Sequence, residues 1–372
     1  MNQEDKTTRA IFSKDDTQIV KGIAVIMMII HHFISNNPGL PVTLSFDNRK
    51  MVIATACKVC VSIFMVLSGY GIMRSWQHTW HHHSHEASEK KKVLLYCKFV
   101  YNHIVKLLFS FWLIYLMCML LFLMRGGVLK NLYGSGRQGV LYLMKDFFDL
   151  YNLYEVTPTL VGAWWFMEAI FVCYFLFPVM NLILEKGKII GAIVLALGTY
   201  SPWILYQIRQ GFDRHTDREL FYLFSFVLGM ICAEYDLFSM FVRYSKVLPV
   251  KGLALIVMTG MFVIRCRYCL IVDPFFAVTV IFVSVCFFSR IPNVSELLKS
   301  FGECSSDIYM FHISILSIMS GVSFVNDKCK VAVIIFFCWS VGLAVAKLKA
   351  TVHYQQLVNR CLIKDRKEVK HG

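Results

Sequence analysis

The chain has 372 residues, of which 57% are hydrophobic and 17% charged, and its mean hydropathy is +0.57. This apolar share is well above that of a soluble domain and excludes one as the main architecture. Apolar runs recur along the whole chain, and no polar stretch is long enough to fold alone. We therefore expect an all-α, polytopic membrane helix bundle.

About ten apolar runs are long enough to cross a membrane as helices. They cover residues 19–35, 51–73, 104–124, 163–183, 189–206, 220–238, 250–264, 269–289, 305–325 and 331–347. The predicted domains are an N-terminal segment (1–18), an integral membrane domain (19–347) and a basic tail (348–372). The first segment lacks the apolar core and cleavage site of a signal peptide, so we expect the first helix to be retained.

The net charge of +14 does not by itself indicate a nucleic-acid partner, because position decides its meaning in a membrane protein. With a cytoplasmic N-terminus, most of the 38 Lys and Arg fall in inward-facing segments, which predicts that both termini are cytoplasmic. The basic tail would then face anionic lipid of the inner leaflet. We expect the lipid bilayer, and no nucleic acid, as a partner.

Neither the cysteines nor the histidines predict a metal site. The 13 cysteines lie mostly in apolar spans, where Cys behaves as a small hydrophobe, and the CxxC of Cys57 and Cys60 has no second pair. Histidines also cluster in a charged loop without acidic or Cys partners at helical spacing: His78, His81, His82, His83 and His85. We expect neither a metal nor another bound cofactor.

The first span carries a cation at one end and two histidines at the other. At about 100° and 1.5 Å per residue, Lys21 and His32 share one helix face roughly 16 Å apart, and His31 points about 100° away from His32. An ionisable group inside a bilayer costs on the order of 3 kcal/mol or more, so it normally faces a protein interior or a wet cavity. This face is the first candidate site.

Two later spans carry further polar groups. Trp164 and Trp165 are typical of an interfacial aromatic belt, but Glu168 lies about one turn inside the membrane, where a carboxylate needs a cation, a donor or a ligand hydroxyl. Tyr309 and His312 are three residues apart and share a helix face. A histidine bonded to a neighbouring helix explains that position as well as a functional one.

With these residues in view, the chain resembles the acyltransferase-3 family of bacterial membrane O-acyltransferases, which modify cell-surface glycans. The family's first helix carries Arg, ten residues and then His; Lys21 and His32 have this spacing, with Lys in place of Arg. The second-helix pattern Phe-Phe-Val-Leu-Ser-Gly-Phe is similar to residues 64–70, which include Ser68.

Three further motifs follow in the family's order. The basic stretch before the third helix, usually two arginines three apart, is here His103 and Lys106. The pattern from Trp to Phe-Pro in the fourth helix resembles residues 165–178; many members have a Glu where this chain has Ile170, with Glu168 nearby. Residues 301–312 are similar to the late Gly, Ser, Ile-Tyr, His signature.

The resemblance implies an O-acyltransferase of the bacterial inner membrane that passes an acyl group, most often acetyl, from acyl-coenzyme A to a sugar hydroxyl of a glycan acceptor. A hydroxyl is a poor nucleophile until a base removes its proton, and general-base help is worth about 10²- to 10⁴-fold. The implied roles are His32 as base with His31 as the next candidate, Lys21, His103, Lys106 and Ser68 for the donor, Trp165 and Glu168 for the acceptor, and Tyr309 and His312 in support.

Two other functions stay open on the sequence. A glycan or lipid-linked-sugar transporter or flippase also needs intramembrane charge, although residues 1–186 and 187–372 show no corresponding broken helices. A catalytically inactive relative that serves as an assembly partner would explain the missing arginines.

Overall fold

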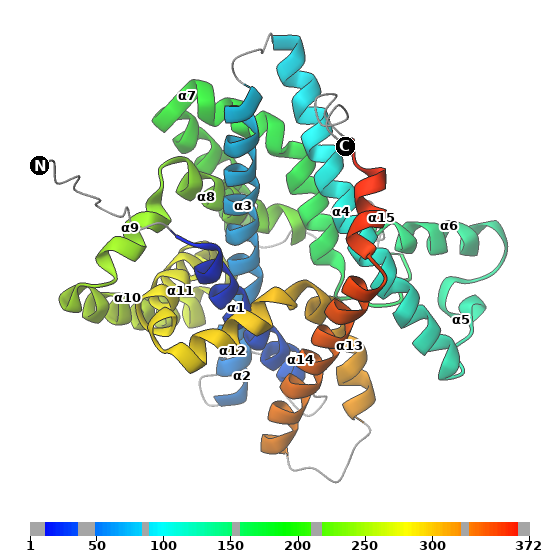
Figure 1. Ribbon diagram of the computed structural model, residues 1–372. Helices are drawn as coiled ribbons and strands as arrows, with labels where there is room; N and C mark the ends of the chain where they lie inside the picture. Colours follow the sequence, from blue (N-terminus) through cyan, green and yellow to red (C-terminus); the bar gives the residue numbers. More distant parts are fainter. Residues whose placement is uncertain are drawn as a thin grey trace, which may run out of the picture. The chain divides into compact units, whose positions relative to one another are not determined.

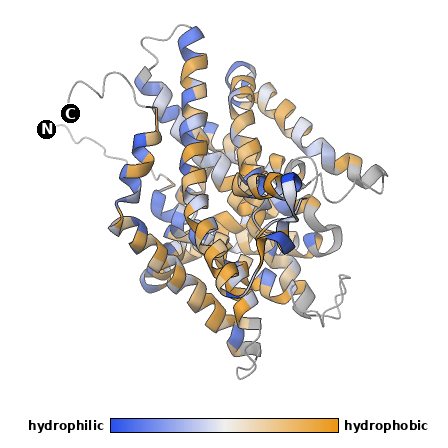
Figure 2. Cartoon of the chain, turned by 90° about the vertical axis from the view of Figure 1, so that its right-hand side faces the viewer, coloured by the Kyte–Doolittle hydropathy of each residue, from blue (hydrophilic) through white to orange (hydrophobic). Residues whose placement is uncertain are grey.

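The computed structural model describes residues 12–35, 49–83, 89–150, 157–209, 218–320 and 327–363. Every regular element in these ranges is helical, so the predicted all-α class is confirmed (Figure 1). The chain divides into two compact units: unit 1 comprises residues 1–71 and 228–303, and unit 2 comprises residues 72–227 and 304–372. Hydrophobic residues cover much of the helices, as a lipid-facing surface requires (Figure 2).

Unit 1 contains the first helix of the chain and a later pair of helices that form a hairpin. Its helices are α1 (Lys14–Ser35), α2 (Arg49–Cys57), the start of α3 (Cys60–His83), the end of α8 (Arg218–Glu234), α9 (Leu237–Tyr244), α10 (Leu248–Tyr268), α11 (Asp273–Phe287) and α12 (Pro292–Glu303). Short 3₁₀ turns, η2 (Cys269–Val272) and η3 (Phe288–Arg290), flank α11.

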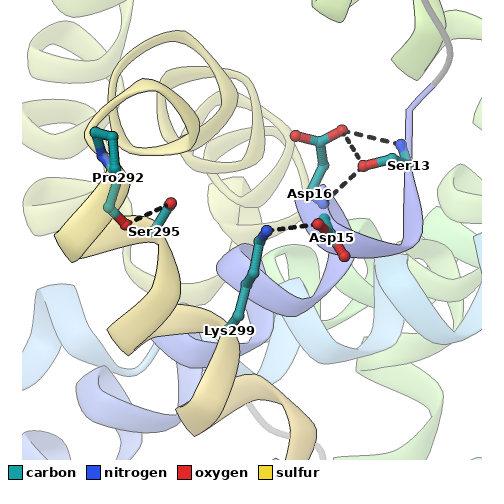
Figure 3. A network of polar contacts seen from close by, with 6 residues as sticks. All are labelled: Ser13, Asp15, Asp16, Pro292, Ser295 and Lys299. Atoms are coloured by element: carbon teal, nitrogen blue, oxygen red, sulfur yellow. Dashed lines mark hydrogen bonds and ion pairs between the residues drawn. The ribbon is translucent and has the colours of Figure 1, made fainter.

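The polar residues before the first apolar run make the start of α1. Ser13 Oγ accepts a hydrogen bond from the backbone N–H of Asp16 (3.0 Å), and the Asp16 carboxylate accepts one from the N–H of Ser13 (2.9 Å), which is a capping box (Figure 3). This cap begins α1 five residues before the predicted span. Lys299 of α12 also bonds Asp15 (2.5 Å), and this hydrogen bond raises the pKa of Lys299.

Two glycines let α1 and α12 meet backbone to backbone. A Cβ added to Gly22 would lie 2.1 Å from the carbonyl oxygen of Leu298, and one added to Gly302 would lie 2.0 Å from that of Gln18. The contacts pair residue 22 with 298 and residue 18 with 302, so the helices run antiparallel. Small residues at such crossings are typical of membrane helices. The contact at Gly22 holds α1 against α12 at the residue next to Lys21.

Unit 2 is built from longer helices. They are the rest of α3, α4 (Glu89–Met124), α5 (Leu129–Tyr133), α6 (Gly136–Phe147), α7 (Trp165–Arg209), the start of α8, α13 (Ser305–Ser320), α14 (Asp327–Thr351) and α15 (Tyr354–Cys361). In α4, Leu116, Leu120 and Met124 recur every four residues and are exposed, which gives this helix an apolar outer stripe. α13 and α14 lie side by side (Figure 1), joined by an ion pair between Asp307 and Lys349 (2.6 Å).

The described helices contain seven that are long and apolar enough to cross a membrane, or eight if the bent pair of α8 and α9 is one span, so the predicted number of ten is not confirmed. One reason is that α7 includes two predicted spans, 163–183 and 189–206, with a break at Lys188 (φ 47°, ψ −126°). Another is that the ninth predicted span corresponds to α13, which has 16 residues, while residues 321–325 lie outside the described ranges. The sides of the termini stay a prediction.

Candidate active site

The two histidines of α1 form a pair held against α2. Nδ1 of His31 lies 2.7 Å from the carbonyl oxygen of Ala54. Because a carbonyl can only accept, Nδ1 carries the proton and Nε2 is the basic nitrogen of His31. The rings of His31 and His32 stand edge to face with centroids 5.0 Å apart, and both are half-buried. His31 therefore has a fixed orientation and fixes one side of His32.

Lys21 lies on the same uninterrupted helix as the histidines. α1 has no break from Lys14 to Ser35, so the helical spacing that puts Lys21 and His32 on one face is retained. Lys21 is half-buried and precedes Gly22 at the crossing with α12. Ser68, another half-buried residue of unit 1, lies on α3.

Further charges surround the histidine pair. Lys58 occupies the turn between α2 and α3 and acts electrostatically on both histidines, and Arg265 acts on His31. Arg265 is fully buried and bonds Asp273 with Nε to Oδ1 at 2.6 Å and Nη2 to Oδ2 at 3.2 Å. This ion pair was not predicted from the sequence. The available signal was two opposite charges eight residues apart, with Arg265 just after the predicted span 250–264 and Asp273 inside the predicted span 269–289.

A cavity of about 450 Å³ lies in unit 2, within the usual size range of ligand pockets. Its basic lining consists of Lys98, Lys106 and the imidazole of His103, all on α4, and its other polar lining includes Ser75, Thr79, Asn102 and Asn359. The predicted donor residues His103 and Lys106 thus lie in one cavity, and Lys98 joins them. Lys98, Asn102 and Lys106 recur every four residues, so helical spacing gave a signal for Lys98.

The walls of this cavity are held in place by short polar contacts. Asn102 exchanges two hydrogen bonds with the backbone of Ile363, at 3.1 and 3.0 Å, and so attaches the segment after α15 to α4. Nδ1 of His103 lies 2.8 Å from the carbonyl oxygen of Phe99, which orients the ring and leaves Nε2 as its basic nitrogen. Part of the predicted basic tail is therefore a wall of the cavity.

The other predicted residues of unit 2 lie around the start of α7 and on α13. The Tyr309 hydroxyl donates to the carbonyl oxygen of Ala163 (2.5 Å), and Nδ1 of His312 lies 2.5 Å from the carbonyl oxygen of Tyr309. Trp165 is half-buried, whereas Glu168 and His312 are fully buried. Tyr309 thus ties α13 to the turn just before α7, whereas this bond of His312 stays within α13, and the supporting role of both residues stays a prediction.

A buried carboxylate cluster lies beside Glu168. Asp146 accepts hydrogen bonds from Thr159 Oγ1 (2.5 Å), from the N–H of Leu160 (2.9 Å) and from the Tyr133 hydroxyl. Burial nevertheless raises the pKa of Asp146. Asp149 is fully buried, with neither oxygen hydrogen-bonded to any described residue, and burial followed by the charges of Glu168 and Asp146 raises its pKa well above the usual range.

The sequence model of an acyltransferase domain family matches residues 16–348, nearly the whole chain. The chain belongs to the acyltransferase-3 family. No curated protein and no solved structure matches it at a significant level. Together with the apolar helices, membership identifies a multi-pass membrane acyltransferase.

The acyltransferase carries its predicted residues in two groups. Unit 1 contains Lys21, His31, His32 and Ser68, and unit 2 contains His103, Lys106, Trp165, Glu168, Tyr309 and His312. Among the described residues, no three His, Cys, Asp or Glu side chains are arranged to hold a metal ion. His85 of the histidine cluster lies outside the described ranges.

Proposed function

We propose that this acyltransferase moves an acyl group, most often acetyl in its family, from acyl-coenzyme A to a hydroxyl of a cell-surface or exopolysaccharide sugar, in the bacterial inner membrane. The observation that carries the proposal is the cavity of unit 2 with Lys98, His103 and Lys106 in its wall. Coenzyme A is polyanionic, and lysine binds phosphate as a point charge. These side chains therefore suit the phosphates of the donor.

The base of the proposed reaction is His32. An imidazole on α1 with a fixed neighbour, His31, is oriented for proton transfer, and such general-base help contributes about 10²- to 10⁴-fold to a rate. Lys21 would add positive charge for the donor on the same helix face. Without the two-pronged grip of Arg it holds a phosphate less specifically, so we expect a weaker donor affinity than Arg would give.

The acceptor would be bound by aromatic and polar groups at the start of α7. Trp165 is half-buried and its ring lies 5.6 Å from that of Tyr222, so an aromatic surface is available to a sugar. Glu168 is fully buried, so Trp165 is the better candidate for direct contact. We assign Glu168 an indirect part through the carboxylate cluster that includes Asp149.

Acetyl-coenzyme A supplied to the purified protein in lipid nanodiscs tests the proposal, with release of the free thiol as the readout. Wild-type protein should release thiol, and His32→Ala should lose at least about 100-fold in rate while it accumulates normally. His78→Ala, which removes an exposed histidine of α3, is the matched control and should retain the wild-type rate.

Mass spectrometry of surface glycans with and without the gene then identifies the acyl group and its acceptor from the mass that disappears. A fully active His32→Ala variant would remove His32 from the reaction. Transbilayer movement of a glycan by the wild-type protein with no thiol release would instead support the transporter alternative.

A further inference from the structure

The ion pair of Arg265 and Asp273 uses only part of the guanidinium group. Nε and Nη2 of Arg265 point at the two oxygens of Asp273, which links the end of α10 to the first residue of α11. Arg265 is 0% exposed and Asp273 is 1% exposed, so both side chains are buried. The carboxylate holds the guanidinium plane in one orientation.

The remaining nitrogen of Arg265 finds no acceptor in the part of the chain that the structure describes. Nη1 is buried, and no atom of the described residues accepts a hydrogen bond from it. An arginine stays protonated in a protein, so it cannot relieve this by losing a proton. A buried charged donor without a partner is unfavourable and calls for an explanation such as a catalytic role.

The unused edge belongs to a group that acts electrostatically on His31, the fixed neighbour of the proposed base His32. The charges of Arg265 and Lys58 both reach His31, and that of Lys58 also reaches His32. Two cationic side chains therefore act on the histidine pair. Such surroundings stabilise negative charge that develops during a reaction.

We propose that Nη1 of Arg265 stabilises the oxyanion that forms on the acyl carbonyl oxygen during transfer, and that Asp273 is the positioning residue that holds this donor in place. This inference rests on the proposed function. The hydroxyl oxygen of the sugar attacks the carbonyl carbon of the thioester as its proton passes to His32, and the carbonyl oxygen becomes an anion that accepts a hydrogen bond from Nη1. The carbon–sulfur bond then breaks, and the leaving thiolate takes the proton from His32.

A donor of this kind is preorganised. Its orientation is set by Asp273 before substrate arrives, so little reorganisation is needed when charge develops, and removal of one such donor typically lowers kcat by about 10²- to 10³-fold. A long, unbranched lysine could still pair with Asp273 but would lack the second edge of the guanidinium. Arg265→Lys therefore separates the two functions of the side chain.

The test compares thiol release from acetyl-coenzyme A by wild-type protein, Arg265→Lys and a control, Arg290→Lys. Arg290 also belongs to unit 1, and its Nη2 donates to Ser245 Oγ (2.9 Å). We expect Arg265→Lys to lose about 10²- to 10³-fold in kcat with its donor KM changed less than about twofold, while Arg290→Lys keeps the wild-type values. Membrane accumulation and Tm are measured for each variant.

Wild-type kcat in Arg265→Lys would overturn the proposal. If Arg265→Lys does not accumulate, the double variant Arg265→Asp with Asp273→Arg is tested, because it keeps an ion pair but reverses its direction. Normal accumulation of the double variant without turnover supports the proposal. Normal turnover by the double variant overturns it. If neither variant accumulates, the pair serves folding and the proposal is given up. Absence of thiol release by wild-type protein would instead refute the proposed function.

Discussion

The crossing of α1 and α12 gives the sharpest prediction about stability. In Gly22→Ala, the new Cβ would lie 2.1 Å from the carbonyl oxygen of Leu298, whereas ordinary contacts begin at 3.4 Å. The obstacle is backbone and cannot rotate away, so the helices must separate by more than about 1 Å. Overpacking of this kind typically costs about 1–3 kcal/mol.

Gly71→Ala is the matched control, because it is an exposed helical glycine whose added Cβ meets nothing within 4 Å. Both variants gain the helix propensity of Ala, about 1 kcal/mol, so the difference between them isolates the steric cost. At about 2–4 °C per kcal/mol for a large domain, Gly22→Ala should melt several degrees below Gly71→Ala in detergent.

Gly302→Ala should resemble Gly22→Ala, since its Cβ would lie 2.0 Å from the Gln18 carbonyl oxygen. One separation of the helices relieves both clashes, so the double variant should lose less than the sum of the single losses. Equal melting temperatures for Gly22→Ala and Gly71→Ala would refute the backbone contact as described.

Two further predictions concern titration and the donor cavity. Burial raises the pKa of Asp149, so its neutral form stabilises the fold, and stability should fall as pH rises from the ordinary carboxyl value of about 4 toward the raised one. Asn tolerates the left-handed backbone at position 149 (φ 55°), so Asp149→Asn removes the titrating group without backbone strain. This variant should show a smaller fall in Tm between pH 5 and pH 8 than the wild-type protein. An unchanged dependence of Tm on pH would contradict the prediction. Lys106→Gln should raise the donor KM several-fold at low salt, with kcat retained, and the effect should shrink above about 0.15 M because salt screens the charge. The control, Lys91→Gln, changes an exposed lysine of the same helix and should keep the wild-type KM. Equal KM values for both variants would exclude Lys106 from donor binding.

Local pattern predicted the all-helical class, because the hydropathy of a span depends on its own residues, but it divided α7 into two spans. The first span and its motif of Lys21 and His32 lie on one helix, α1, as the sequence predicted. The pairing of helices was not predictable in the same way. Gly22 could be recognised as part of a motif, but its contact with Leu298 depends on how α12 packs, which no local pattern encodes.

Arg265 shows why buried charge is the hardest feature to predict. In the sequence it directly follows the predicted span 250–264, where a cation would lie at the membrane surface and cost little. In the structure the η2 turn brings Asp273 back to it, and both charges are buried together. A pair of hydrophobic residues would often stabilise such a site as well as the ions do, so stability alone does not account for the charges. The comparison of Arg265→Lys with wild-type protein asks directly whether catalysis does.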